Sequence, residues 1–182
     1  MAISRYRFIP LKDIGSVFAA CVVPIHSWAT LTFLYQVTGW IVYLNVWDVI
    51  GTFAYTQAFA FLESLAVLLC VILLAVILPA RVLRDRFVPL GGMLVLLNLA
   101  WAIAVQYTGI IPFTRYVPWH SKKFLLGAVA YLVSLGASYV WVRRHERVQG
   151  AVSSFVERLT VLLYIYIPLS LASIVILIIR NF

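Results

Sequence analysis

The amino-acid sequence predicts an all-α integral membrane protein, a bundle of five transmembrane helices. Hydrophobic residues make up 64% of the 182 residues, whereas soluble domains are typically about half apolar. Charged residues contribute only 11%, and the mean hydropathy is +1.03. The apolar residues form five stretches, each long enough to cross a bilayer core about 30 Å thick.

The predicted spans cover approximately residues 14–36, 53–79, 87–107, 124–142 and 159–179. We interpret each as a helix, because a helix satisfies its own backbone polar groups within the bilayer. A transmembrane β-barrel is excluded, since its strands alternate apolar and polar residues and the run 65–78 is uniformly apolar. All connections are short, so residues 1–182 are expected to form a single transmembrane helical domain.

The first span follows a basic segment, as a signal peptide does, but we expect it to be retained. Pro24, His26 and Trp28 follow its apolar start, and no clear small-residue cleavage site is present. A mid-span proline frees a backbone carbonyl about one turn earlier. Pro168 occupies a similar place in the fifth span.

The segment 39–52 is apolar and aromatic but contains Asn45 and Asp48. An aspartate in the hydrocarbon core costs about 3 kcal/mol, which favours an amphipathic helix lying in the outer interface. Trp40 and Trp47 suit such an interfacial position. A re-entrant segment and an extension of the first span are the alternatives.

Ionisable residues inside a span are candidate functional groups because they are expensive to place there. His26 lies near the middle of the first span, and Glu63 lies well inside the second. Adjacent antiparallel helices would bring them to the same depth, where a His–Glu pair could hold or relay a proton. Alternatively, both residues only fix helix packing. In that case Glu63 is protonated or hydrogen-bonded to Thr30, Asn98 or a serine, and His26 is hydrogen-bonded to a backbone carbonyl.

The connection between the third and fourth spans is expected to anchor the protein at lipid headgroups. Its aromatic and cationic side chains are typical of the membrane interface and suit anionic headgroups. The anchor residues are Arg115, Trp119, His120, Lys122 and Lys123. The alternative is a site for a phosphate, or for the carboxylate of a substrate or partner.

The fourth span carries small residues on one helical face, which lets another helix approach closely. These residues are Gly127, Ala130, Ser134 and Ser138. We expect this face to be buried against protein, either within the bundle or in a partner.

The distribution of Lys and Arg predicts a cytoplasmic N-terminus and a C-terminus on the outer side. Ten of the fourteen basic residues lie in the N-terminal segment and in the second and fourth connections, which share one side of the membrane. Cytoplasmic loops are the ones enriched in Lys and Arg.

No catalytic motif is present, so the first functional hypothesis is a non-catalytic subunit or scaffold of a larger membrane complex. Its expected partners are the lipid bilayer and either another protein or further copies of the chain. The second hypothesis is a small oligomeric channel or proton-coupled transporter that uses His26 and Glu63, with Asn98 as a further polar candidate. A membrane enzyme acting on lipid is a weaker third.

The composition excludes further classes of function. The net charge of +8 comes from short basic clusters between apolar runs, not from a solvated face, so nucleic-acid binding is not expected. Cys21 and Cys70 lie inside spans without a CxxC motif, and no metal site is predicted. No cofactor is predicted either; a haem would have to be shared with a partner through His26.

Overall fold

The computed structural model describes residues 9–108 and 122–181, which form helices joined by turns. The elements are α1 (Leu11–Trp40), α2 (Val46–Ile77), a 3-10 turn η1 (Arg84–Arg86), α3 (Phe87–Thr108), α4 (Lys122–Arg144), α5 (Glu146–Leu159), a 3-10 turn η2 (Thr160–Leu162) and α6 (Leu163–Asn181). Five segments are long and apolar enough to cross a membrane. The prediction of an all-α membrane bundle with five spans is confirmed.

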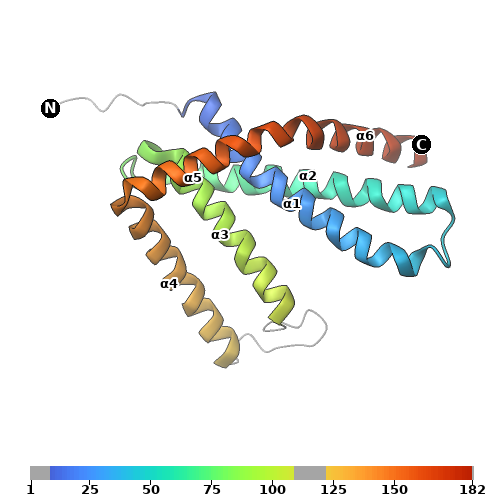
Figure 1. The fold of residues 1–182 in the computed structure, drawn as a ribbon, viewed down its shortest axis with the longest axis horizontal. Helices are drawn as coiled ribbons and strands as arrows, with labels where there is room; N and C mark the ends of the chain where they lie inside the picture. The colour runs from blue at the N-terminus through green and yellow to red at the C-terminus, as the bar shows by residue number, and fades with distance from the viewer. Residues whose placement is uncertain (1–8, 109–121, 182) are drawn as a thin grey trace.

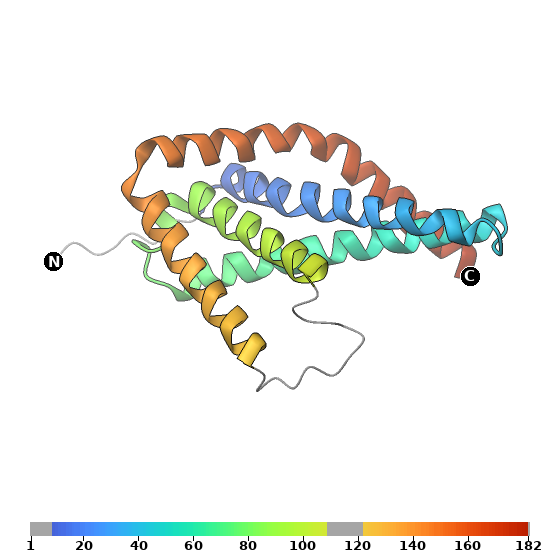
Figure 2. The same ribbon diagram turned by 60° about the horizontal axis from the view of Figure 1, so that its bottom comes forward.

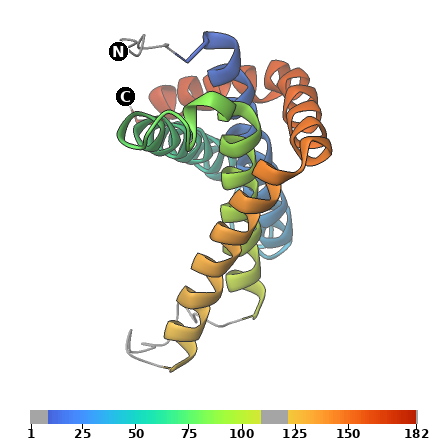
Figure 3. The same ribbon diagram turned by 90° about the vertical axis from the view of Figure 1, so that its left-hand side faces the viewer.

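α2 and α6 run along the long axis of the molecule, α1 runs obliquely to them, and α3 and α4 diverge as a second arm (Figure 1). The divergence is also visible in the perpendicular view of Figure 3. α1 contacts α2, α3, α5 and α6 and is the most buried of the five spans. α4 contacts α3 and α5 and is the least buried.

α1 and α2 are built for close approach. Lipid tails are as apolar as the side chains, so helix association in a membrane depends on close packing rather than on the hydrophobic effect. The buried positions of these two helices are accordingly rich in small residues: Ser16, Ala19, Ala20, Gly51, Ala54, Ala58, Ala60, Ser64 and Ala75.

Residues 39–52 do not form a helix of their own. α1 continues to Trp40, the chain turns, and α2 begins at Val46. The side chain of Asn45 caps α2 by accepting a hydrogen bond of 2.9 Å from the backbone N–H of Asp48. α1 has 30 residues and is therefore about 45 Å long, which is longer than the bilayer core. No separate interfacial helix is needed to carry the chain from the core to the surface. The structure has none of the three alternatives for the whole segment, since residues 39 and 40 end α1, residues 41–45 form the turn and residues 46–52 begin α2.

The connection between the fourth and fifth spans contains a helix that the sequence analysis did not predict. Val148, Val152, Val156 and Leu159 recur at helical spacing along α5, and they pack against the apolar core. α5 contacts α1 and α3. It then turns through η2 into α6, and the two helices arch over the beginning of α1 (Figure 2).

Candidate functional site

A buried polar cluster lies where α1, α2 and α6 meet. It contains His26 of α1, Gln57 of α2 and Ser170 of α6, and each is 0% exposed. Nδ1 of His26 lies 2.7 Å from Oε1 of Gln57, and Nε2 lies 3.4 Å from Oγ of Ser170. The imidazole therefore bridges three helices.

The neighbours of this cluster determine which group donates. Gln57 donates from Nε2 to the hydroxyl of Thr30 at 3.0 Å, which turns its amide oxygen toward His26. Because that oxygen can only accept, Nδ1 of His26 carries the proton. The hydroxyl of Ser170 donates to the carbonyl of Tyr166 at 2.7 Å. The long separation from Nε2 to Ser170 makes the bond with Gln57 the principal polar contact of the ring.

Tyr166 adds a second link between α1 and α6. Its ring lies beside the imidazole of His26, with the two centroids 5.2 Å apart. Its hydroxyl lies 2.8 Å from the hydroxyl of Ser27. Both ring nitrogens of His26 thus face side chains of this same chain, so ligation of a haem iron would require one of these side chains to move away.

This cluster is arranged to hold helices together. Every buried side-chain nitrogen and oxygen within the described residues has a hydrogen-bond partner. Buried polar groups that bond across helices fix a unique packing, whereas proton movement needs a path to water, and the three central side chains have no exposed surface.

The structure does not pair His26 with Glu63. Gln57 and Ser64 are seven residues apart, close to two helical turns, and both are fully buried on one face of α2. Glu63 is one residue away from Ser64, a rotation of about 100°, and it is exposed. Within the described residues it makes no hydrogen bond or ion pair.

Asn98 joins α3 to α4 and does not contribute to the His26 cluster. Its Nδ2 donates to the carbonyl of Leu94 at 2.7 Å, and its Oδ1 accepts from the hydroxyl of Tyr131. One turn further along, Nε1 of Trp101 donates to the hydroxyl of Ser134 at 2.9 Å. Two polar contacts therefore connect the helices of the second arm.

The small-residue face of α4 is divided between two environments. Gly127, Ser134 and Ser138 are half-buried, whereas Ala130 is exposed. Through Ser134 this face contacts α3 of the same chain.

Most of the predicted headgroup anchor lies outside the described residues. This holds for Arg115, Trp119 and His120, while Lys122 and Lys123 begin α4. The anchor stays a prediction.

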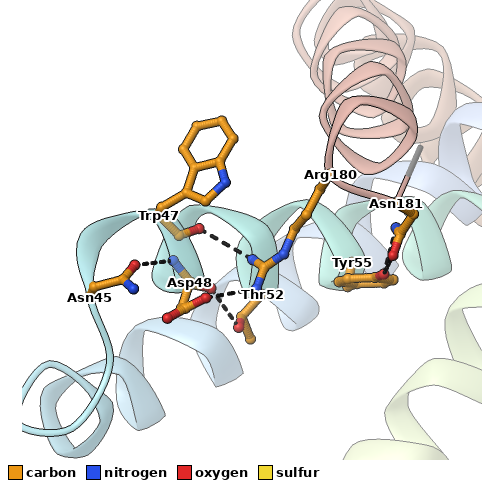
Figure 4. Close-up of polar contacts among 7 residues, drawn as sticks. All are labelled: Asn45, Trp47, Asp48, Thr52, Tyr55, Arg180 and Asn181. Atoms are coloured by element: carbon orange, nitrogen blue, oxygen red, sulfur yellow. Dashed lines mark hydrogen bonds and ion pairs between the residues drawn. The ribbon is translucent and has the colours of Figure 1, made fainter.

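A second polar cluster fastens the end of α6 to the beginning of α2 (Figure 4). Nη2 of Arg180 lies 2.7 Å from Oδ1 of Asp48, and Nη1 donates to the carbonyl of Trp47 at 3.2 Å. Gly51 makes room for the guanidinium, since a Cβ there would lie 1.5 Å from Nη1 of Arg180.

A hydrogen-bonded pair one turn away strengthens this attachment. The amide of Asn181 donates to the hydroxyl of Tyr55 at 2.8 Å. The Asp48 and Arg180 side chains are 33% and 29% exposed, and ion pairs at such surfaces contribute about 0–1 kcal/mol. The cluster therefore orients the end of α6 more than it stabilises the whole fold.

The described residues contain no group of three or more His, Cys, Asp and Glu side chains that could hold a metal ion. Cys21 and Cys70 are both free thiols. Comparison of the chain with protein-family models, with curated proteins and with solved structures found no match.

Proposed function

We propose that this membrane protein is a non-catalytic subunit of a larger membrane complex, and that the outer face of α2 around Glu63 contacts its partner. The single observation that carries the proposal is the exposure of this carboxyl in the middle of a transmembrane helix. Glu63 follows the first residue of α2 by 17 positions and precedes the last by 14, so it lies about 25 Å and 21 Å from the two ends.

The surroundings of Glu63 on this face are apolar. Phe59 and Leu62 are 60% and 59% exposed, and Ala66 and Cys70, three and seven residues after Glu63, are exposed as well. A charged group facing lipid at mid-membrane costs about 3 kcal/mol, and the described residues of this chain offer Glu63 no partner that would reduce this cost. A hydrogen-bond donor on another transmembrane helix would do so.

The partner that fits this face is a different protein rather than a second copy. A two-fold interface between copies would bring this same patch against itself, and the exposed side chains near Glu63, such as Phe59 and Leu62, offer its carboxyl no hydrogen-bond donor. A helix with a lysine, an arginine or another donor at this depth is complementary, because such a group can hydrogen-bond the carboxylate. We therefore propose a heteromeric interface.

The arrangement of α4 also supports a role in assembly. α4 is an apolar span with little of its surface buried within the chain, and most of its large side chains are exposed. The transport hypothesis, by contrast, depends on a His26–Glu63 pair. His26 bonds Gln57 and Glu63 faces outward, which favours a role in assembly over transport.

Site-specific photo-cross-linking in the membranes of the source organism tests this proposal. A photoreactive residue replaces Leu62 beside Glu63, and a matched control replaces Leu171 of α6, which is exposed to nearly the same degree, 57% against 59%. We expect one discrete protein adduct from position 62 and lipid adducts from position 171.

The Glu63→Leu substitution in the cross-linking chain should reduce the protein adduct about tenfold, the factor expected for one hydrogen bond to a charged group. Lipid adducts alone from both positions, or an adduct that Glu63→Leu leaves unchanged, would contradict the proposed interface.

A further inference from the structure

A cleft of about 630 Å³ lies between the beginning of α1 and the junction of α5 with α6. It is independent of the Glu63 face and of the His26 cluster, whose residues do not line it. Its size lies within the range of about 300–1,000 Å³ found for small-molecule sites. The arch of α5 and α6 over α1 (Figure 2) forms one of its walls.

The lining of the cleft is polar at one end and apolar at the other. Lys12, near the start of α1, and Glu157, near the end of α5, contribute opposite charges. Leu163, Ile167 and Pro168 continue the lining along α6. Because Glu157 and Pro168 are separated by roughly three helical turns, the polarity changes over about 15 Å. This matches the change from headgroup to acyl chain in a phospholipid.

The two charges do not satisfy each other. The ion pair found within the described residues is the one between Arg180 and Asp48, and the side chains of Lys12 and Glu157 are both exposed. A ligand that carries a negative and a positive group would engage both side chains. A purely anionic headgroup would suit Lys12 but would be repelled by Glu157.

We propose that this cleft binds an aminophospholipid, a lipid with a phosphate and a primary ammonium in its headgroup. Lys12 faces the phosphate, and the carboxylate of Glu157 accepts hydrogen bonds from the ammonium. A choline headgroup has no N–H to donate, so the ethanolamine headgroup fits Glu157 better. The apolar lining from Leu163 to Pro168 receives the first part of an acyl chain.

Gly15 gives direct access to this cleft. It lines the cleft, and a Cβ at this position would meet nothing within 4 Å. A leucine at position 15 would therefore extend into the space that the lipid occupies. Leucine is also a better helix former than glycine, so the Gly15→Leu chain should fold.

Native mass spectrometry of the full chain in mild detergent tests the proposal. Phosphatidylethanolamine, phosphatidylcholine and phosphatidylglycerol with the same acyl chains are added separately, and the bound fraction is measured. We expect the wild-type protein to bind phosphatidylethanolamine about tenfold better than the other two, the factor that one charge-assisted hydrogen bond provides.

The substitutions separate the contributions of the two charges. Glu157→Gln should lower binding of phosphatidylethanolamine about tenfold and raise that of phosphatidylglycerol. Lys12→Gln should weaken both, and Gly15→Leu should weaken all three lipids. Glu146→Gln and Arg147→Gln make the same charge changes at the opposite end of α5 and should bind as the wild type does.

Two results would overturn this assignment. The first is equal retention of the three lipids by the wild type, or a preference for phosphatidylglycerol. The second is lipid binding that stays at the wild-type level in Lys12→Gln and Glu157→Gln, as it should in the two control substitutions.

Discussion

The hydrogen bond between His26 and Gln57 can be tested by replacing Gln57 with leucine, which has a similar size but no polar atoms. The substitution leaves Nδ1–H of His26 without its acceptor at 2.7 Å, and it removes the donor to Thr30 at 3.0 Å. Polar contacts between membrane helices average about 0.6 kcal/mol and reach about 1.7 kcal/mol. An orphaned buried donor costs about 1–3 kcal/mol. We therefore expect the free energy of unfolding to fall by about 1–2 kcal/mol.

A double-mutant cycle isolates this bond from changes in packing. His26→Leu alone orphans the amide of Gln57, but the double variant removes both partners, so its loss should be smaller than the sum of the single losses. We expect a coupling energy of about 1 kcal/mol. Ser170→Ala is a matched control on the other side of the ring, and its 3.4 Å separation should give little coupling.

The measurement is reversible unfolding in mixed micelles with a rising fraction of denaturing detergent, followed by circular dichroism. If Gln57→Leu unfolds at the same detergent fraction as the wild type, or if the two single losses simply add, then the bond does not hold α1 against α2.

Four further substitutions probe other contacts in the fold. Gly92→Ala would place a Cβ 2.7 Å from a side-chain atom of Val156 of α5, whereas a Cβ at Gly91 would lie 3.4 Å from its nearest neighbours. We expect Gly92→Ala to lower the free energy of unfolding by about 1–3 kcal/mol. Gly91→Ala, measured in the same assay, should lower it much less. Gly51→Ala should displace the guanidinium of Arg180 and lower the free energy of unfolding by less than about 1 kcal/mol. It should also make the end of α6 more sensitive to protease. Unchanged cleavage at the end of α6 would contradict the attachment of α6 to α2. Tyr131→Phe removes one of the two polar contacts between α3 and α4 and should destabilise the chain by about 0.6 kcal/mol, and no loss would show that this contact does not hold the arm.

The number of spans could be predicted from the sequence because hydropathy and length alone decide which segments enter a bilayer. The ends of the spans were harder to predict from the sequence. Polar residues such as Asn45 and Asp48 look unfavourable inside a helix, yet α2 uses the first as its cap and the second in its first turn, where an acidic side chain interacts favourably with the helix dipole.

The burial of His26 could be predicted from its position in the first span, but its hydrogen-bond partner, Gln57, could not. Glu63 was the more conspicuous candidate because it is charged. The helical phase determines the outcome, since Gln57 shares a face with Ser64 and Glu63 does not. The repeated small residues of α2 mark this inward face in the sequence.

α5 was missed for a related physical reason. Its arginines are typical of a connection outside the bilayer. For this reason the helical spacing of the apolar residues Val148, Val152 and Val156 was not used to predict a helix. A short amphipathic helix between two spans keeps its charged side chains exposed while its valines pack on α3.

The reaction of a hydrophobic carbodiimide with Glu63 tests the proposed interface most directly. The reagent dissolves in the lipid phase and modifies carboxyl groups that it can reach, and mass spectrometry of the peptide that contains position 63 measures the modified fraction. We predict that Glu63 is protected in the membranes of the source organism, and becomes modified once the chain is purified alone in detergent. Equal modification of Glu63 in both preparations would mean that lipid, and not a partner, covers this face in the membrane.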